Sequence, residues 1–195
     1  MNDGEPNEYV MSPRILVVDL ETTGLDANKH SIVEMGAVWL TGGVGEFQMD
    51  CQMWEGAKWD DRAADVHGLS MARCTNPVLP TEGEAILELL NWCEATQDEP
   101  VMLAGLNPSF DRAFVLRACE RAGVKVARAF RHRVLDLHSL AVAHGLSDVL
   151  EIPSRGLYTD EIYALLGLPA EPKPHRALVG ARKEAEALSK IIGLV

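Results

Sequence analysis

The feature that most constrains the fold is an apolar run that leads directly into two acidic residues and a turn. Residues 15–18 read Ile-Leu-Val-Val and are followed by Asp19-Leu20-Glu21 and then by Thr-Thr-Gly. This order predicts a buried β-strand that ends in a turn. Because successive strand side chains point to opposite faces, Asp19 and Glu21 project from the same face. The sequence therefore predicts a strand whose end carries a pair of carboxylates.

Such a pair of carboxylates predicts a metal site. Two like charges at the end of a buried strand are unfavourable unless a positive group neutralises them. Oxygen ligands, in a chain without paired cysteines or clustered histidines, favour Mg²⁺ or Mn²⁺ over Zn²⁺. An ordinary acidic boundary between a strand and a loop remains the alternative for an isolated Asp-x-Glu.

A third acidic residue lies at the start of a predicted helix. Residues 101–105 form a short apolar segment, predicted to be a strand, and Asn107-Pro108 follows it. Asn is a favoured N-cap and Pro a favoured first helical residue, so a helix is predicted over 108–122, with Gly123 as its stop. Asp111 then lies in the first turn, where the helix dipole favours a carboxylate. It is either a metal ligand or simple compensation of that dipole.

The last predicted helix opens near His175 and contains an unexpected glycine. Its apolar side is formed by Ala177, Leu178, Ala181, Ala185, Leu188 and Ile191. Gly180 interrupts these helix-forming residues at a cost of roughly 1 kcal/mol relative to alanine. A local conflict of this kind indicates a functional position, a close backbone contact or a substitution. We favour a substitution at a functional position.

In their order and separation, these motifs resemble the DEDDh, or DnaQ-like, family of 3′-to-5′ exonucleases. The first family motif is similar to Val18–Leu25 and the second to Asn107–Asp111. The third, His-x-Ala-x-x-Asp-Ala, is met by His175, Ala177 and Ala181 but not at position 180. Weaker agreement extends through 32–38, 66–69 and 135–141, so the resemblance covers about residues 13–192.

The resemblance implies a site with two divalent ions, Mg²⁺ or Mn²⁺, held by four acidic residues. Such ions position an attacking water and stabilise the leaving 3′ oxygen of a phosphodiester. Glu21 would bridge both ions, Asp19 and Asp111 would complete most of the site, and His175 would act as general base. The residues implied to meet the substrate are Thr22, Thr23, Gly24, Leu25, His67, Asn107 and Phe110. Core packing remains the alternative for Leu25, and a structural turn the alternative for His67.

Gly180 stands at the position of the family's last metal-binding aspartate, so we expect this form of the protein to be impaired. Even changes in the shell around metal ligands commonly cost about 10- to 100-fold. Glu184 is one turn further on, about 6 Å along the helix axis, which is more than its additional methylene can bridge. We therefore do not expect Glu184 to compensate. An inactivated variant of an aspartate parent and a natural relative that uses the fold for binding both remain open.

Length and composition predict one domain in a reducing compartment. A chain of 195 residues with 47% hydrophobic residues supports one complete core. We expect a flexible tail over residues 1–12 and a single exonuclease domain over 13–195. Four scattered cysteines and the lack of an apolar leader or membrane-length run predict a cytoplasmic protein without a membrane partner.

The charge of the chain indicates which class of nucleic acid it is expected to bind. A net charge of -11 opposes long-range attraction to nucleic acid, so tight, processive binding to a duplex is not expected. Basic residues do gather between Arg112 and Arg133, either as a face for a phosphate backbone or as ordinary solvated surface. This balance favours 3′ ends of single strands or short oligonucleotides, with delivery by a protein partner as another route.

The remaining pattern predicts an α/β fold with three layers and a mixed central sheet. It consists of a hairpin over 31–40 and 44–54, a helix after a capping box at 81–84, a strand over 130–135, and helices over 136–143 and 160–166. A ribonuclease-H-like architecture is implied by the resemblance. The leading function is a metal-dependent 3′-to-5′ exonuclease releasing nucleoside monophosphates from single-stranded DNA or short oligonucleotides. A catalytically inactive nucleic-acid-binding or regulatory module and an oligoribonuclease or RNA 3′-end trimming enzyme are the alternatives.

Overall fold

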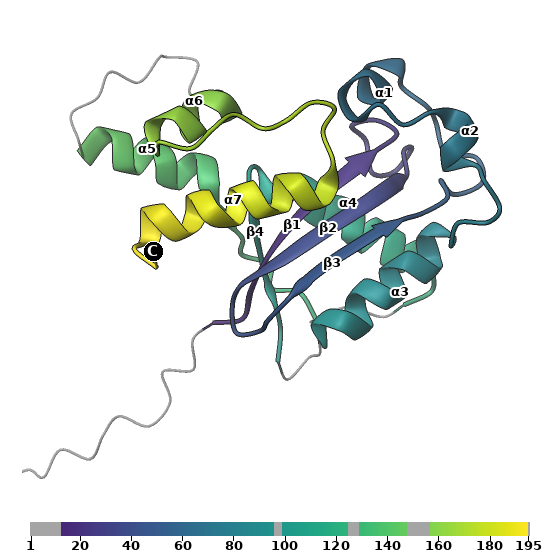
Figure 1. Cartoon of the computed structure of the whole chain (residues 1–195). Coiled ribbons are helices and arrows are strands. Elements are labelled where there is room, and N and C mark those ends of the chain that lie inside the picture. The colour runs from purple at the N-terminus through teal and green to yellow at the C-terminus, as the bar shows by residue number, and fades with distance from the viewer. Residues whose placement is uncertain (1–12, 96–98, 125–128, 148–156, 195) are drawn as a thin grey trace, which may run out of the picture.

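A five-stranded mixed sheet forms the centre of the computed structural model, which describes residues 13–95, 99–124, 129–147 and 157–194 (Figure 1). The strands are β1 (Ile15–Thr22), β2 (Ile32–Thr41), β3 (Glu46–Asp50), β4 (Met102–Gly105) and β5 (Leu135–Asp136). Their order in the sheet is β3-β2-β1-β4-β5. The β1–β2 and β2–β3 pairs are antiparallel, whereas the β1–β4 and β4–β5 pairs are parallel. The sheet confirms the predicted mixed α/β architecture.

Helices cover both faces of this sheet. α3 and α4 lie on one face, and α5, α6 and α7 lie on the other, as Figure 1 shows. The helices of the described residues are α1 (Asp61–His67), α2 (Met71–Cys74), α3 (Glu82–Cys93), α4 (Pro108–Arg121), α5 (Leu137–Ser147), α6 (Thr159–Leu165) and α7 (Ala177–Ile192). The result is the predicted arrangement of three layers.

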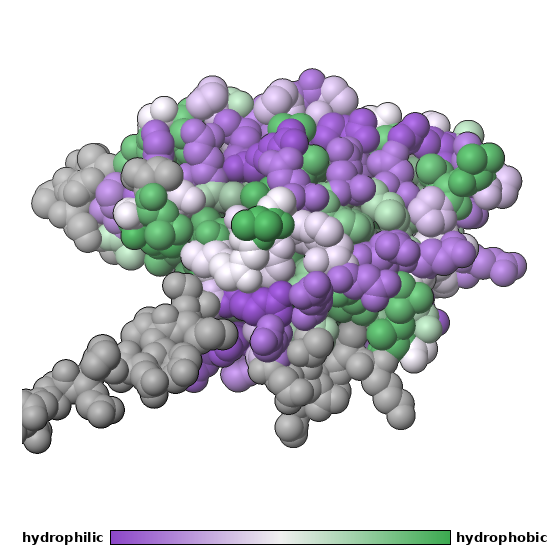
Figure 2. Space-filling view, turned by 60° about the horizontal axis from the view of Figure 1, so that its bottom comes forward, coloured by the Kyte–Doolittle hydropathy of each residue, from purple (hydrophilic) through white to green (hydrophobic). Residues whose placement is uncertain are grey.

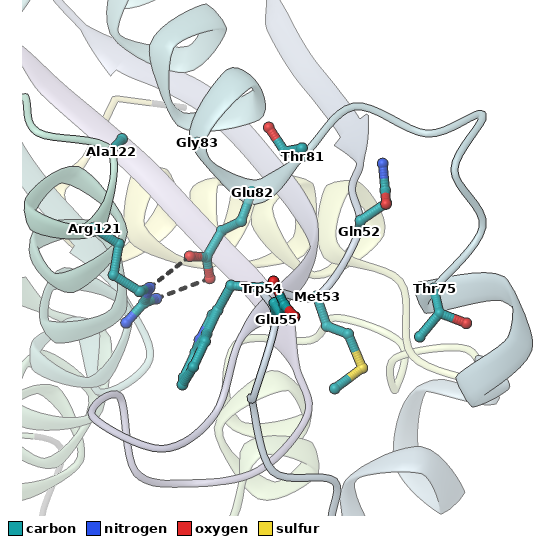
Figure 3. Close-up of a pocket in the computed structure, with 10 residues that line it drawn as sticks. All are labelled: Gln52, Met53, Trp54, Glu55, Thr75, Thr81, Glu82, Gly83, Arg121 and Ala122. Atoms are coloured by element: carbon teal, nitrogen blue, oxygen red, sulfur yellow. Dashed lines mark hydrogen bonds and ion pairs between the residues drawn. The ribbon is translucent and has the colours of Figure 1, made fainter.

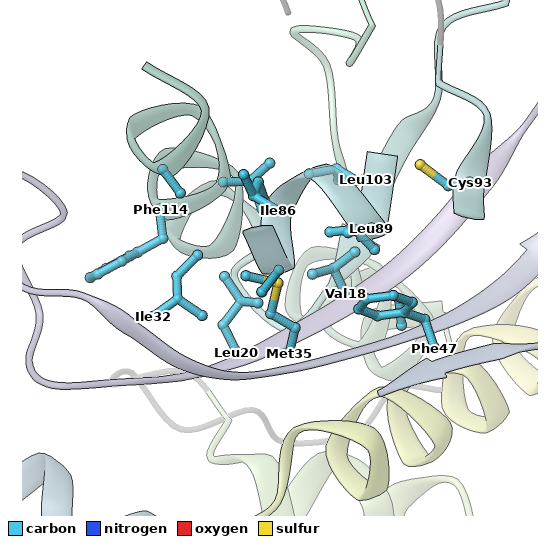
Figure 4. Close-up of a cluster of buried hydrophobic side chains, with 14 of the residues drawn as sticks. Val18, Leu20, Ile32, Met35, Phe47, Ile86, Leu89, Cys93, Leu103 and Phe114 are labelled. Atoms are coloured by element: carbon cyan, nitrogen blue, oxygen red, sulfur yellow. The ribbon is translucent and has the colours of Figure 1, made fainter. Parts of the chain in front are cut away.

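Alternation along β1 assigns its side chains to the two layers. Leu16, Val18 and Leu20 pack into the cluster beneath α3 and α4, which Figure 4 shows. Ile15 and Val17 pack into the opposite cluster with α5, α6 and α7. Because the strand period is two, the two carboxylates that follow Val17 on its face project toward the α7 side. The alternation therefore directs both acidic residues of β1 to the face where α7 begins.

Several elements differ from the sequence prediction in their bounds. The predicted strand over 130–135 is reduced to one bridge between Val101 and Phe130 and to the two-residue β5. β3 ends at Asp50, before the predicted end at residue 54. α7 begins at Ala177 and not at His175, whose backbone N–H instead donates to the Val66 carbonyl. These differences arise because tertiary hydrogen bonds decide where an element stops.

Two short helices, α1 and α2, were not predicted. Each is too short to show helical periodicity, but each begins at a residue whose side chain caps it. Asp60 accepts a hydrogen bond from the backbone N–H of Arg62, and Ser70 accepts one from that of Arg73. The capping box of α3, by contrast, forms as predicted between Thr81 and Glu84.

The surface carries hydrophilic and hydrophobic residues interspersed on the face that Figure 2 shows. Over the described ranges, no helix is both long and apolar enough to span a bilayer. The predicted tail over residues 1–12 lies outside the described residues.

Candidate active site

A cavity of about 160 Å³ lies where the end of β1 meets the starts of α4 and α7. It is lined mainly by carboxylates that come from distant parts of the sequence. The lining residues are Asp19, Leu20, Glu21, Leu106, Asn107, Phe110, Asp111, Thr159, Glu171, His175 and Glu184. The structure therefore brings together the predicted ligands Asp19, Glu21 and Asp111 and the predicted base His175.

Local structure explains how α4 presents Asp111. β4 ends at Gly105, and Asn107 is the N-cap of α4 with Pro108 after it, as the sequence predicts. The cap differs in one respect, because Asn107 has a left-handed backbone with φ of 54° and its side chain makes no capping hydrogen bond. Asn tolerates this conformation better than most residues. The side chain of Asn107 lines the cavity instead, and Asp111 follows one turn later, buried.

The carboxylates of the cavity oppose one another. Burial raises the pKa of Asp19 well above its ordinary range, and Glu184, Asp111, Glu21 and Glu171 raise it further. Burial, with Glu34 and Glu171, raises the pKa of Glu21 to about 7. Burial is also the main cause that raises the pKa of Asp111 to about 8. The cavity thus concentrates negative charge that the surrounding side chains do not neutralise.

The donor set suits a hard divalent cation, since every candidate ligand is a carboxylate oxygen. The side chains are not gathered around one point, however. Across the described ranges, no three His, Cys, Asp or Glu side chains are arranged so as to hold a metal ion. An ion would therefore have to draw the carboxylates together by side-chain rotation.

Gly180 lies in the first turn of α7, against the same cavity. A Cβ atom at this position would overlap Oδ2 of Asp19, and it would lie 3.4 Å from Oε1 of Glu171. The Asp19 carboxylate therefore lies in the volume that a side chain at position 180 would need. The glycine is a site of close approach between β1 and α7, as well as the position of the missing family aspartate.

The segment before α7 is fixed by two contacts. The backbone N–H of His175 donates to the Val66 carbonyl at 3.1 Å. Nε of the next residue, Arg176, donates to Oε2 of the fully buried Glu34 at 2.7 Å. The His175 ring lines the cavity while staying partly exposed, and its Nδ1 lies 3.7 Å from Oε2 of Glu171. This places a partly accessible imidazole at the edge of the acidic site.

Two further carboxylates in the cavity are not predicted as site residues. Glu184, which is not expected to compensate for Gly180, is nevertheless buried and lines the cavity. The Glu184 carboxylate lies against Gly105, whose lack of a side chain leaves space for it. Glu171 comes from the segment between α6 and α7, and no local pattern marks it. The helical spacing from Gly180 could have indicated Glu184.

The predicted substrate residues at the end of β1 and directly after it form a tight, mostly buried turn. Oγ1 of Thr22 donates to the Gly24 carbonyl at 2.8 Å, and Oγ1 of Thr23 accepts from the backbone N–H of Ser31 at 2.9 Å. Leu25 is the exception, with 81% of the residue exposed. Core packing, the alternative explanation for Leu25, is therefore excluded.

His67 and Phe110 have different surroundings. His67 ends α1 and is buried, its Nδ1 accepts from the backbone N–H of Leu69 at 2.9 Å, and its ring meets the edge of Trp59. Burial lowers the pKa of His67. It does not line the acidic cavity, whereas Phe110 does and also contacts Phe114. The structure thus brings Phe110, but not His67, to the cavity.

A second cavity, of about 380 Å³, lies between α3, α4 and the segment after β3 (Figure 3). Two of its charged residues, Arg121 and Glu82, are paired with each other. Arg121 donates to both carboxylate oxygens of the buried Glu82, at 2.8 and 2.9 Å, and lies over the Trp54 ring. Glu82 also accepts from Ser31 and from the backbone of Ile32. These contacts identify a structural connection between α3, α4 and the start of β2.

The proposed basic face is also partly neutralised. Besides Arg121, which pairs with Glu82, Arg117 pairs with Glu120. Nε of Arg112 donates to the Arg131 carbonyl, which orients this side chain without neutralising its charge. Lys125 and Arg128, two further basic residues between Arg112 and Arg133, lie outside the described residues. The described arginines therefore offer less free positive charge than their number in the sequence indicates.

The model of the exonuclease family RNase_T matches residues 16–188. The chain belongs to this exonuclease family. The match begins in β1 and ends in α7, so it includes every residue of the acidic cavity. Membership confirms the resemblance that the motifs indicate.

Individual relatives agree with this assignment. The chain is 26% identical to ribonuclease T of Marinobacter nauticus over 211 residues, which cover 98% of this chain and 90% of that protein. Solved structures with the same fold include Exonuclease I from Methylocaldum szegediense, with a TM-score of 0.71 and 16% identity over 92% of this chain and 40% of that one.

Two ligand-bound structures share the fold as well. E. coli Exonuclease I in complex with a dA16 oligonucleotide has a TM-score of 0.72 and 14% identity, over 93% of this chain and 41% of that one. The nuclease domain of 3′hExo, a DEDDh family member bound to rAMP, has a TM-score of 0.68 and 16% identity, over 92% of both chains. The chain therefore spans about 40% of the exonuclease I chains but nearly all of the 3′hExo domain. The comparisons confirm the ribonuclease-H-like exonuclease fold.

Proposed function

We propose that the protein is a metal-dependent 3′-to-5′ exonuclease that releases nucleoside monophosphates from single-stranded DNA or short oligonucleotides. The observation that carries this proposal is the acidic cavity, in which Asp19, Glu21 and Asp111 face a partly exposed His175 in a chain of an exonuclease family. The carboxylates converge from three separate parts of the sequence. A purely structural role would leave their mutual repulsion without compensation.

Asp19, Glu21 and Asp111 would hold two divalent ions, Mg²⁺ or Mn²⁺. When bound, these ions supply an activated water and stabilise the oxygen that leaves. His175 accepts a proton at its edge of the cavity. Oε2 of the Glu171 carboxylate lies 3.7 Å from Nδ1 of His175, at the same edge of the cavity.

The turn after β1 supplies the surface for the terminal nucleotide. Thr22 and Thr23 hold the turn by their hydroxyl groups, and the exposed Leu25 is free to pack against a base. A single strand suits this arrangement because its bases are unpaired and can be contacted directly. The dA16 oligonucleotide bound to E. coli Exonuclease I, a protein of the same fold, supports a single-stranded substrate.

RNA 3′-end trimming is the second candidate function. It is favoured by the similarity to ribonuclease T over 90% of that protein and by the rAMP bound to 3′hExo. The chemistry at the phosphorus atom would be the same, and only contacts to the 2′-hydroxyl would differ.

The test is cleavage of 5′-labelled single strands of DNA and RNA with the same base sequence, in Mg²⁺, in Mn²⁺ and in EDTA. We expect a ladder that shortens from the 3′ end, requires the metal, and is lost in Asp19→Asn. The ratio of DNA to RNA rates decides between the two candidate substrates. A ladder that persists in EDTA, or in Asp19→Asn, would contradict the proposed metal site.

An inactive binding module remains the alternative, and Gly180 is the reason to test it. The predicted impairment is measured by comparing the wild-type protein with Gly180→Asp in the same assay. Oligonucleotide binding without cleavage by either protein would favour the binding module. The single domain over 13–195, the cytoplasmic location and a protein partner for delivery stay predictions from sequence.

A further inference from the structure

We propose that Glu171 supplies the carboxylate that position 180 lacks, so that an acidic residue from the segment before α7 replaces the missing metal ligand of α7. This inference rests on the proposed function, because it names a ligand of that metal site. It also changes the expectation for Gly180, since a substituted ligand lessens the impairment that its loss alone would cause.

The first argument is position. Oε1 of Glu171 lies 3.4 Å from the point that a Cβ atom of residue 180 would occupy, which is van der Waals contact. Glu171 therefore places a carboxylate beside the volume of the absent side chain. The same point is in contact with Asp19, a predicted ligand, so the two carboxylates approach the gap at position 180 from different elements.

The second argument is the unsatisfied oxygen. The Glu171 side chain is only 8% exposed, and its Oε1 is buried without a hydrogen-bond partner in the described part of the protein. Buried polar atoms without partners are rare and costly in folded proteins. An oxygen that is buried, unpaired and adjacent to other carboxylates has the environment of a cation ligand.

The third argument is that the other unexpected carboxylate is already engaged. Glu184 accepts a hydrogen bond from the backbone N–H of Leu106, and its Oε2 lies against Gly105. Burial raises the pKa of Glu184 most, and the nearby Asp111 carboxylate is the next largest cause. Glu184 thus lies close to Asp19, whose pKa it raises, and to the β4 and α4 side of the cavity, whereas Oε1 of Glu171 lies, with Asp19, nearest the place of a Cβ atom at position 180.

The backbone around Glu171 limits its movement. Pro172 and Pro174 follow it and restrict the backbone, and the N–H of His175 is tied to the Val66 carbonyl. A second buried polar atom without a partner in the described residues is the hydroxyl of Tyr163, whose pKa is raised by burial first and then by the neighbouring Glu184, Glu171 and Asp19. The Glu171 carboxylate is therefore held on a restrained segment in a region with unused polar atoms.

The test is Mn²⁺ binding to the metal-free, full-length protein, measured by calorimetry and by electron paramagnetic resonance. We expect two ions per wild-type chain. In Glu171→Gln, one ion should bind at least about 10-fold more weakly, and the increase in melting temperature produced by Mn²⁺ should shrink. Glu186→Gln, which removes an exposed carboxylate on α7, is the matched control and should bind as the wild type does.

Restoring metal binding with a second substitution distinguishes a Glu171 that binds the ion from a Glu171 that only supports the fold. In Glu171→Gln/Gly180→Asp, rotation of the Asp19 side chain away from the place of the new Cβ atom lets the aspartate supply the carboxylate that the glutamine no longer provides, so the second ion should return. Because Glu171→Gln keeps the size of the side chain and removes a buried charge, we expect the metal-free melting temperature to be unchanged or higher. Mn²⁺ binding in Glu171→Gln identical to that of the wild type would overturn the proposal. Loss of the second ion in Glu184→Gln but not in Glu171→Gln would overturn it as well.

The same samples distinguish this proposal from the proposed exonuclease. Two Mn²⁺ ions that fall to one in Glu171→Gln, without cleavage of any oligonucleotide, would support the ligand and contradict the activity. Metal-dependent cleavage with equal Mn²⁺ binding in wild type and Glu171→Gln would support the activity and reject Glu171 as a ligand. A wild-type chain that binds no Mn²⁺ would reject both.

Discussion

At the scale of the residue, the absent side chain at position 180 leaves a volume that two carboxylates approach. Asp19 overlaps the place of its Cβ atom, and Glu171 contacts that place from the other segment. A family aspartate at 180 would have to displace Asp19 or rotate past it. The observed conformation of Asp19 therefore requires glycine at position 180, and any side chain there would require Asp19 to move.

Leu25 gives a residue-scale prediction about substrate. Leu25→Ala should raise KM roughly 5-fold, because truncation removes about 1 kcal/mol of apolar contact with a base, while kcat and the melting temperature stay nearly unchanged. Val44→Ala is the control, because Val44 is 90% exposed and lies outside the residues of the cavity. Steady-state kinetics on a single-stranded oligonucleotide measure the effect. Equal KM for Leu25→Ala and wild type would exclude Leu25 from substrate binding.

At the scale of the element, α3 and α4 are joined by the ion pair between Glu82 and Arg121. Glu82 is buried and bonded to the start of β2 as well, through Ser31 and Ile32. The pair therefore holds two helices against the sheet, on the face opposite α7 (Figure 3). This differs from the role in phosphate binding that the run of arginines indicates in the sequence.

The consequence is a prediction about stability. Arg121→Met should lower the free energy of unfolding by about 3 kcal/mol, because it leaves the buried Glu82 without its partner. Arg117→Met is the control, since its pair with Glu120 is exposed and worth at most about 1 kcal/mol. Urea denaturation measures both variants. Unchanged stability of Arg121→Met, with a smaller salt dependence of oligonucleotide binding, would restore the phosphate-binding role.

At the scale of the whole molecule, the acidic cavity couples folding to metal and pH. Three layers meet at the site, because β1, α4 and α7 each contribute to its wall. The fold brings buried carboxylates together at a cost in stability, and a bound cation would recover that cost. Metal-free protein should therefore be the less stable form.

The pH dependence follows from Glu21 and Asp111. Their pKa values rise from 4.5 and 3.8 to about 7 and about 8 on folding. At a pH between the unfolded and folded pKa values of each group, the folded protein keeps a proton that the unfolded chain has released. The free energy of unfolding therefore falls as pH rises. The melting temperature in EDTA should decrease from about pH 5 to about pH 8, and millimolar Mg²⁺ should restore it most at the upper end.

Asp111→Asn provides the control for this dependence, because it removes one of the carboxylates whose pKa is raised on folding and should flatten the decrease. Thermal scans of wild type and variant over the same pH range measure the effect. A melting temperature in EDTA that increases toward pH 8 would contradict the assigned environment of the two carboxylates.

Local patterns account for what the sequence predicts correctly. Alternation in β1 places Asp19 and Glu21 on one face, and the Asn-Pro start of α4 places Asp111 in a first turn. The capping box of α3 is likewise a relation between residues three apart. Each depends on neighbours in the chain, so each can be predicted without knowledge of the tertiary structure.

Contacts between distant segments account for the rest. The sequence by itself determined the family, the mixed sheet and the carboxylates of β1 and α4, because strand period and helix capping are local properties. Only the tertiary structure placed Glu171 beside position 180, brought Glu184 into the cavity, and paired Arg121 with Glu82. The physical reason is that these positions depend on how α7 and its preceding segment pack against β1, β2 and α4, a packing that no local pattern specifies.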